Sequence, residues 1–268
     1  MQRATSRQNP RLREAARLIA SSRDRRKAGR CVLEGEHLLT VYLERVGAPE
    51  FVLLVEELAT APHLAPLLPQ LATGDLVAVP AALFAEVTGL PPALGVVAVI
   101  ATPQPPLAAG ARFHLLVDDL QDPGNVGTLL RTAAAAGVDA VLLSKHCAFA
   151  WSPKVLRAGQ GAHFLTTIVE DVDLPAWAAA FRGHGGQVAA TVPRGGADLY
   201  AQAFAWPLAI AIGNEGAGLS AALLAQCDRR VTIPMPGATE SLNASAAAAI
   251  VLFEALRQSR GAAILRSP

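Results

Sequence analysis

Strand-like and helix-like stretches alternate through the second half of this 268-residue chain. Short apolar runs, which are typical of buried strands, are followed by stretches with helical periodicity. The strand-like runs are FHLLVDD (113–119), DAVLL (139–143), TTIV (166–169), QVAAT (187–191), LAIAIG (208–213) and RVTIP (230–234). The helical stretches are 126–137, 153–161, 175–183, 219–227 and a long one over 242–260. This alternation predicts an α/β domain with a largely parallel sheet covered on both faces.

A proline-rich stretch, ATPQPPLAAGAR (101–112), interrupts every periodic pattern and predicts a linker. The expected organisation is therefore a small domain at 1–104, a linker at 105–112 and the parallel-sheet domain at 113–268. The small domain reads as α/β as well. It begins with an amphipathic basic helix and continues with strand-like runs at 31–34, 51–57, 75–80 and 94–100.

The charge of the chain is concentrated at its beginning. Residues 1–30 carry ten basic and two acidic side chains, a net charge of +8, in a chain whose total is +1. Such asymmetry is typical of a segment that binds a polyanion, with nucleic acid the leading candidate. A solvated basic helix without a partner is the alternative. The candidate RNA-binding side chains are Arg7, Arg11, Arg25, Arg26 and Lys27.

Other features exclude several classes of protein. The three cysteines, Cys31, Cys147 and Cys227, have neither CxxC nor metal-ligand spacing, so reduced thiols and no metal site are expected. The basic start lacks the apolar segment of a signal peptide. No apolar run reaches the roughly 18 residues of a membrane span. We therefore expect a cytoplasmic protein without a membrane partner.

Polar segments follow three of the predicted strands. In open parallel sheets, ligands bind at the carboxyl ends of strands. Segment 117–133 turns at Asp122 and begins a helix that Asn125 could cap. Arg131, near the start of this helix, is suited to bind a phosphate. A surface ion pair with Asp119 or Asp122 explains Arg131 equally well.

The second polar segment, AIGNEGAGLS (211–220), has glycines in the order G-x-x-G-x-G, which is not the dinucleotide fingerprint. Glu215 would also repel a pyrophosphate. A ligand with little negative charge fits better, and S-adenosyl-L-methionine carries a sulfonium and an amino group against one carboxylate. A tight loop whose glycines serve only the turn is the alternative.

The third segment, 233–243, precedes the long helix and is rich in turn formers and hydrogen-bonding side chains. Its prolines stiffen the backbone, and Ser241 and Asn243 present polar groups at the start of the helix. These two residues could cap the helix, contact a ligand or do both. Apolar side chains that could line a slot for adenine are Ile212, Leu219, Ile233 and Leu242.

The order of these segments resembles a known family. DPGNVGTLLRTA (122–133), IGNEGAGLS (212–220) and IPMPGATESLNASAAAA (233–249) resemble the three motifs of the SpoU (TrmH-like) family of RNA 2′-O-ribose methyltransferases. SPKVLRAGQGAHF (152–164) is also similar to that family. Residues 6–39 resemble the opening of its accessory RNA-substrate-binding domain, which has a small αβα fold similar to ribosomal RNA-binding proteins.

The resemblance implies more than the pattern does. It implies a deep trefoil knot of the SPOUT type in the C-terminal domain and a homodimer formed through that domain, with active sites near the dimer interface. It implies S-adenosyl-L-methionine as cofactor. Cofactor-contact positions are Gly213, Ile233 and Leu242, with Ile212, Gly218 and Met235 as further candidates. The polar positions around the substrate are Asn125, Arg131, Glu215, Ser241 and Asn243.

A mechanism follows as a hypothesis. None of the three motifs contains a histidine, and a guanidinium is a poor base. We therefore expect Arg131 to bind the RNA phosphate that helps accept the proton and to stabilise the developing alkoxide. Asn125 would orient the ribose, and Glu215 would position Arg131 or Asn125. Ribosomal RNA is favoured over transfer RNA because of the N-terminal domain; a nicotinamide-dependent oxidoreductase and a non-catalytic RNA-binding protein are the rival functions.

Overall fold

The computed structural model describes residues 1–72 and 74–264, and its internal contacts divide the chain into two compact units. The first unit joins Met1–Pro103 to Trp151–Phe164. The second joins Gln104–Ala150 to the residues from Leu165 onward. The predicted end of the first domain at residue 104 lies beside this division, whereas the packing of 151–164 with the first unit was not predicted. The limits of independently folding domains stay a prediction.

The first unit is built on a mixed five-stranded sheet in the order β1-β4-β3-β5-β2. The strands are β1 (Gln2–Arg3), β2 (Arg30–Glu34), β3 (Phe51–Val55), β4 (Leu76–Val79) and β5 (Val96–Ala101). The helices are α1 (Pro10–Ala20), α2 (Ser22–Ala28), α3 (Glu36–Arg45) and α4 (Ala81–Thr88), with 3₁₀ turns at Glu56–Leu58, Leu68–Gln70 and Pro92–Leu94. The apolar stripe of α1 packs on one face of this sheet, together with Phe84 of α4. Residues of α1 that are fully buried there are Leu12, Ala15 and Leu18.

Segment 151–164, which the first unit includes, contains α6 (Pro153–Gly159) and a 3₁₀ turn at Ala162–Phe164. Arg157 of α6 forms an ion pair with the buried carboxylate of Glu34, at the end of β2. The rings of Tyr42 and Phe164 meet edge to face, with centroids 5.2 Å apart. Burying a carboxylate requires a partner, so this ion pair fixes α6 against β2.

The second unit confirms the predicted parallel sheet. Seven strands lie in the order β10-β12-β9-β11-β6-β7-β8, and every neighbouring pair is parallel. They are β6 (Phe113–Val117), β7 (Ala140–Leu143), β8 (Thr167–Val169), β9 (Gln187–Thr191), β10 (Ala197–Asp198), β11 (Leu208–Ile212) and β12 (Arg229–Thr232). The central strands are mostly apolar because both faces of the sheet are covered, and the buried His114 of β6 is an exception. The trefoil knot stays a prediction.

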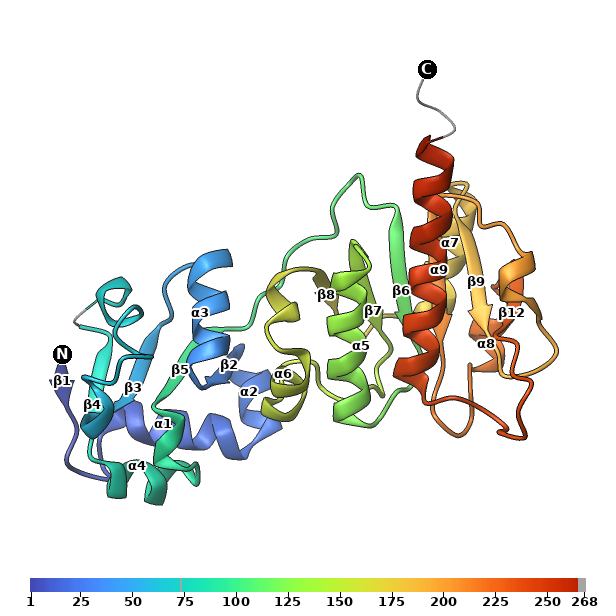
Figure 1. Ribbon diagram of the computed structural model, residues 1–268. Coiled ribbons are helices and arrows are strands. Elements are labelled where there is room, and N and C mark those ends of the chain that lie inside the picture. The colour runs from blue at the N-terminus through green and yellow to red at the C-terminus, as the bar shows by residue number, and fades with distance from the viewer. Residues whose placement is uncertain (73, 265–268) are drawn as a thin grey trace. The chain divides into compact units, whose positions relative to one another are not determined.

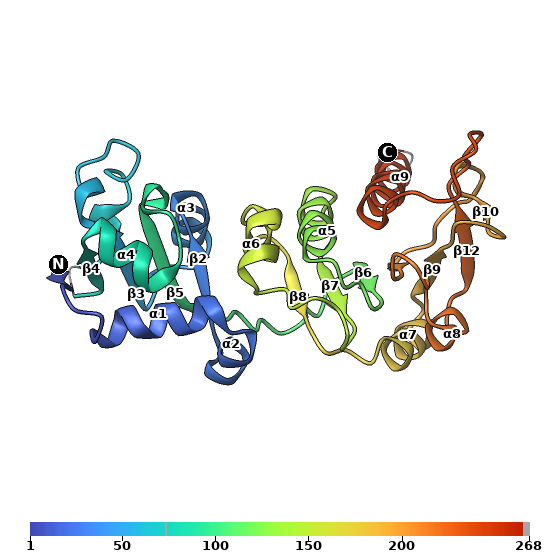
Figure 2. The ribbon, with the colours of Figure 1, turned by 90° about the horizontal axis from the view of Figure 1, so that it is seen from below.

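Helices cover both faces of this sheet. Figure 2 shows α5 (Pro123–Ala135) and α9 (Ala244–Ile264) on one side, and α7 (Leu174–Gly183) and α8 (Ala221–Leu224) on the other. Leu174 and Leu223 belong to the core under α7 and α8. On the opposite side α5 and α9 pack against each other, as Figure 1 shows. A 3₁₀ turn lies at Leu199–Ala201. Among the described residues, no helix combines the length and the apolar character that a membrane crossing requires.

Candidate functional site

The three polar segments meet at one edge of the seven-stranded sheet. The Cα of Ile212, the last residue of β11, is paired with that of Val117, the last residue of β6. On the other side of β11, Thr191 at the end of β9 is paired with Val231 of β12. Because all these strands are parallel, the loops that follow them emerge together. The register therefore brings the three predicted segments to the same edge of the sheet, where β9 lies between β11 and β12.

The loop after β11 is closed by its own backbone. Asn214 and Gly218 exchange hydrogen bonds of 2.9 and 3.0 Å, and the Asn214 side-chain oxygen accepts from Gly216 N at 2.9 Å. A Cβ on Gly213 would lie 2.2 Å from the carbonyl carbon of Gly218. Only glycine permits this approach, so Gly213 is required for the shape of the loop.

Two side chains anchor this loop to the end of β6. The Asp118 carboxylate accepts from Ser220 N at 2.8 Å, and Asn214 Nδ2 donates to the carbonyl of Asp119 at 2.7 Å. Asp118 is buried, where a carboxylate needs such donors. Neither Asp118 nor Asn214 was among the predicted site residues. Their position directly after a strand end was the available signal.

A chain of side-chain amides links the three segments. Asn243 Nδ2 donates to Asn125 Oδ1 at 2.8 Å, and Asn125 Nδ2 donates to Glu215 Oε1 at 3.0 Å. Of the two residues that Glu215 was expected to position, Arg131 and Asn125, the structure shows a bond to Asn125. The expected cap by Asn125 was wrong: Asp122 caps α5 by accepting from Asn125 N at 2.7 Å. The Asn125 side chain is thus available for the other two segments.

Asn243 also starts the last helix. Its Oδ1 accepts from Ser245 N at 2.9 Å and from the Ser245 hydroxyl at 2.6 Å. The helix begins at Ala244, two residues after the predicted start, because the extended approach continues to this cap. Asn243 is therefore both a cap and a member of the amide chain.

Replacing Asn243 with alanine should lower the free energy of unfolding by about 1 kcal/mol, because α9 loses its N-cap. Asn243→Ser keeps an oxygen that can cap and should recover most of this loss, although it cannot donate to Asn125. Urea denaturation followed by circular dichroism measures both variants. Equal destabilisation of the two would assign the effect to the lost bond with Asn125 instead.

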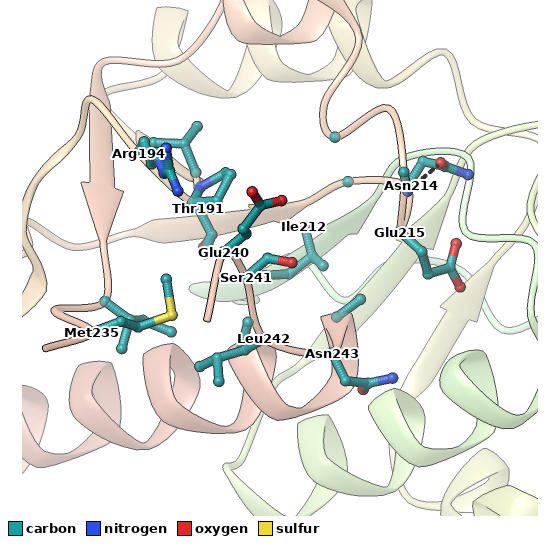
Figure 3. Close-up of a pocket in the computed structure, with 18 residues that line it drawn as sticks. Thr191, Arg194, Ile212, Asn214, Glu215, Met235, Glu240, Ser241, Leu242 and Asn243 are labelled. Atoms are coloured by element: carbon teal, nitrogen blue, oxygen red, sulfur yellow. Dashed lines mark hydrogen bonds between the residues drawn. The ribbon is translucent and has the colours of Figure 1, made fainter. Parts of the chain in front are cut away.

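A pocket of about 640 Å³ opens at this edge. It is lined by residues from the ends of β9 and β11, from the stretch after β12 and from the first turn of α9. Figure 3 shows its middle, where Ile212, Met235 and Leu242 supply apolar surface. All six predicted cofactor-contact residues line the pocket: Ile212, Gly213, Gly218, Ile233, Met235 and Leu242.

The predicted substrate residues divide into two groups. Glu215, Ser241 and Asn243 line the pocket, and Asn125 is hydrogen-bonded to two of them. Arg131 is exposed on α5 and is not among the lining residues. Among the described residues it makes no ion pair, so neither Asp119 nor Asp122 binds it. The structure thus leaves Arg131 available to a partner outside this pocket.

Besides Asn214, three polar lining residues were not among the predicted site residues: Thr191, Arg194 and Glu240. Thr191 ends β9, and Arg194 follows in the loop before β10. The predicted strand that ends at residue 191 was the signal for Thr191 and Arg194, because ligands bind at the carboxyl ends of parallel strands. Glu240 belongs to the predicted polar segment 233–243. Two glutamates and one arginine line the pocket, which gives it a net charge of −1.

The candidate RNA-binding residues of the first unit are only partly suited to that role. The prediction that Arg25 binds RNA was wrong. Only 5% of this residue is exposed, and its guanidinium donates to the carbonyls of Leu18 and Ile19 at the end of α1. Arg7 pairs with Glu86, and Arg11 donates to the carbonyl of Gly74 at 2.6 Å. Arg26 and Lys27 are exposed.

The cysteines and histidines of the described chain offer no alternative chemistry at this edge. No histidine or cysteine lines the pocket. Burial raises the pKa of the Cys227 thiol to about 11 and also raises that of Cys147, so both are neutral thiols near pH 7. No three His, Cys, Asp or Glu side chains of the described residues are placed to hold a metal ion.

Comparison with known proteins agrees with this geometry. Residues 112–253 match the model of the SpoU rRNA methylase family. The 23S rRNA (guanosine(2553)-2′-O)-methyltransferase RlmP of Bacillus subtilis is 35% identical over 88% of this chain and 92% of its own length.

Solved structures resemble the chain over nearly its whole length. The SpoU methyltransferase AviRb of Streptomyces viridochromogenes, in complex with AdoMet, has a TM-score of 0.84 and 29% identity, and the match covers 94% of this chain and 99% of AviRb. An AdoMet-bound rRNA methyltransferase of Sinorhizobium meliloti has a TM-score of 0.79 and 27% identity, with 96% and 97% covered. The resemblance inferred from the three motifs is confirmed: the chain belongs to the SpoU rRNA methylase family.

Proposed function

We propose that this protein transfers a methyl group from S-adenosyl-L-methionine to a ribose 2′-hydroxyl of ribosomal RNA. The observation that carries the proposal is the pocket at the carboxyl edge of the parallel sheet. It gathers six candidate cofactor residues beside the chain of Asn243, Asn125 and Glu215. The membership of the family supports the same reaction.

The lining of the pocket fits this cofactor. S-adenosyl-L-methionine carries a net positive charge, and the pocket carries a net charge of −1. The side chains of Ile212, Ile233 and Leu242 offer an apolar slot for adenine, and the backbone around Gly213 offers hydrogen-bonding groups at its edge. The net negative charge of the lining disfavours the pyrophosphate of a nicotinamide dinucleotide. When bound, the cofactor supplies an electrophilic methyl group on a sulfonium.

The chain's own residues would orient the acceptor. Asn125 already has its amide fixed by Glu215 and Asn243, so a hydrogen bond to the ribose would require little reordering. In our proposal Arg131 binds the phosphate next to the reactive ribose. That phosphate helps accept the proton of the 2′-hydroxyl, and the guanidinium stabilises the negative charge that develops on the oxygen.

We propose that a second copy of the chain completes the site. Arg131 lies outside the pocket lining and points to no acidic partner among the described residues. It sits on α5, which packs beside α9, and α9 exposes 47% of Phe253. Aromatic residues are enriched in protein interfaces, and in our proposal Phe253 lies in the contact between two copies. A homodimer through this face would bring the Arg131 of one copy toward the pocket of the other.

The reaction is testable with purified protein and RNA that lacks modification. Ribosomal and transfer RNA are incubated with methyl-labelled S-adenosyl-L-methionine and digested to nucleosides. We expect labelled 2′-O-methylnucleosides from ribosomal RNA, since RlmP and the Sinorhizobium enzyme are named for rRNA. Label in transfer RNA would change the proposed substrate, and no label in either RNA would favour a non-catalytic RNA-binding role. We keep the cytoplasm as the expected location of this reaction.

The first unit would bind the RNA backbone through exposed basic side chains. Four such residues on α1 and α2 form no ion pair in the described part of the chain: Arg13, Arg17, Arg23 and Lys27. We therefore propose these four residues as the RNA-binding surface, and we no longer include Arg7, Arg11 and Arg25. Deleting residues 1–30 would not test this surface, because α1 supplies buried core residues.

Replacing Arg13, Arg17, Arg23 and Lys27 together with glutamine should weaken RNA binding and reduce the slope of log affinity against log salt by about 3, because fewer counterions are released. Filter binding at several salt concentrations measures the slope. A matched control replaces Arg3 and Arg7, which pair with Glu56 and Glu86. A slope that stays unchanged in the fourfold variant would move the RNA surface elsewhere.

A further inference from the structure

Two opposite charges line one side of the pocket. Arg194 lies in the loop after β9, and Glu240 lies in the stretch before α9. Of the described lining residues, Arg194 alone carries a positive charge. Figure 3 shows both side chains on the same side of the apolar middle, with Glu215 on the other side and its carboxylate directed away. The pocket therefore has two chemically different ends.

Neither Arg194 nor Glu240 has a protein partner. In residues 1–72 and 74–264, neither side chain forms a hydrogen bond or an ion pair, and both are exposed. Glu215, in contrast, is bound by Asn125. Arg182, another arginine of this unit, is bound by Asp228 at 2.6 Å. Arg194 and Glu240 are thus both free to bind a ligand, and both line the space where one fits.

We propose that Arg194 and Glu240 recognise the amino-acid end of S-adenosyl-L-methionine, Arg194 through the carboxylate and Glu240 through the ammonium group. This inference rests on the proposed function. A guanidinium suits a carboxylate because it presents two parallel donors. Glu240 is placed to accept from the ammonium group on the same side of the pocket. The negative carboxylate and the positive ammonium group of the cofactor are thus each opposite in charge to the side chain that binds them.

This assignment also orients the whole cofactor. The adenosyl group takes the apolar slot of Ile212, Ile233 and Leu242. The amino-acid end takes the side of Arg194 and Glu240, and the sulfonium then faces the side of Glu215, Asn243 and Asn125, where the ribose is oriented. Arg194 thereby acts as a binding residue that positions the cofactor, and it takes no part in the proton transfer.

Calorimetric titration of the full-length protein tests the assignment without measuring activity. The probes are S-adenosyl-L-methionine, S-adenosylhomocysteine and 5′-methylthioadenosine, which lacks the amino-acid end. Arg194→Ala should bind the first two about tenfold more weakly, as expected for one lost hydrogen bond to a charged group at a partly solvated site. Its affinity for 5′-methylthioadenosine should be unchanged. Glu240→Gln should give the same selective loss.

Arg230→Ala is the matched control, because Arg230 is an exposed arginine of the same sheet that does not line the pocket. An equal loss in this variant would mean a general effect of charge and overturn the assignment. Equal weakening of all three probes by Arg194→Ala would mean that Arg194 only shapes the loop. Unchanged affinities with weaker RNA binding would assign Arg194 to an RNA phosphate. Wild-type protein that binds none of the probes would refute the proposed function itself.

Discussion

Arg131→Ala should lose at least about 100-fold in the rate of methyl transfer while binding S-adenosyl-L-methionine normally. Removing one group that stabilises the developing oxyanion typically lowers kcat by about 10²–10³. Cofactor affinity should be retained because Arg131 does not line the pocket. Single-turnover methylation and calorimetric titration measure the two quantities. Arg131→Lys, which keeps the charge but not the paired donors, should fall between the wild-type protein and the alanine variant.

The same residue tests whether two copies build one site. A heterodimer of an Arg131→Ala chain and a Gly213→Ala chain, purified through two tags, has one pocket intact and one arginine intact. If Arg131 acts across the dimer, one of the two sites is complete, and activity should return to about half of the wild-type value. If Arg131 acts within its own chain, the heterodimer should be as inactive as either parent. Wild-type turnover in Arg131→Ala itself would remove this residue from the mechanism.

Gly213→Ala should abolish cofactor binding, with an affinity lowered at least about 100-fold. The new Cβ would lie 2.2 Å from Gly218 C and 2.3 Å from Leu219 N, and these are backbone atoms. The loop must therefore open, which disrupts the paired hydrogen bonds of Asn214 and Gly218 and displaces the pocket wall. Thermal unfolding should also begin at a lower temperature, because overpacking of this kind destabilises the fold.

Gly216→Ala is the control for that variant. It lies three residues further along the same loop, and its Cβ would meet only Asn214 Oδ1 at 3.7 Å, an ordinary contact. We expect cofactor affinity and thermal stability close to those of the wild-type protein. Normal cofactor binding by Gly213→Ala would contradict the role of this loop as a wall of the cofactor pocket.

Local sequence patterns were sufficient for the second unit. Its six longer strands and the helices between them were predicted because continuous apolar runs and helical periodicity are local signals. The two-residue strand β10 has no such signal, and its pairing with β12 depends on the neighbouring backbone. Helices α2 and α4 were also missed. The sequence of α2 is polar except for Ala28, so its boundaries are set by the Ser21 cap and the left-handed Gly29.

Contacts between distant residues were harder to predict. Parallel strand ends implied that the three segments converge, but Asn125 and Asn243 are 118 residues apart, and no periodicity specifies that their side chains meet. The burial of Arg25 illustrates the opposite error. Its charge suggested RNA, whereas its position relative to the end of α1 turns the guanidinium toward backbone carbonyls. The distribution of charge along a sequence predicts that a basic surface exists. Which arginine and lysine side chains are exposed on that surface depends on the tertiary structure.

The central claim is that one pocket at the carboxyl edge of the sheet holds the methyl donor. A crystal structure of the protein with S-adenosyl-L-methionine tests it most directly. We expect the adenosyl group in the pocket that Ile212, Gly213, Ile233 and Leu242 line. The amino-acid end should contact Arg194 and Glu240. Density for the cofactor at another place on the chain, or an empty pocket at a saturating concentration, would contradict the claim.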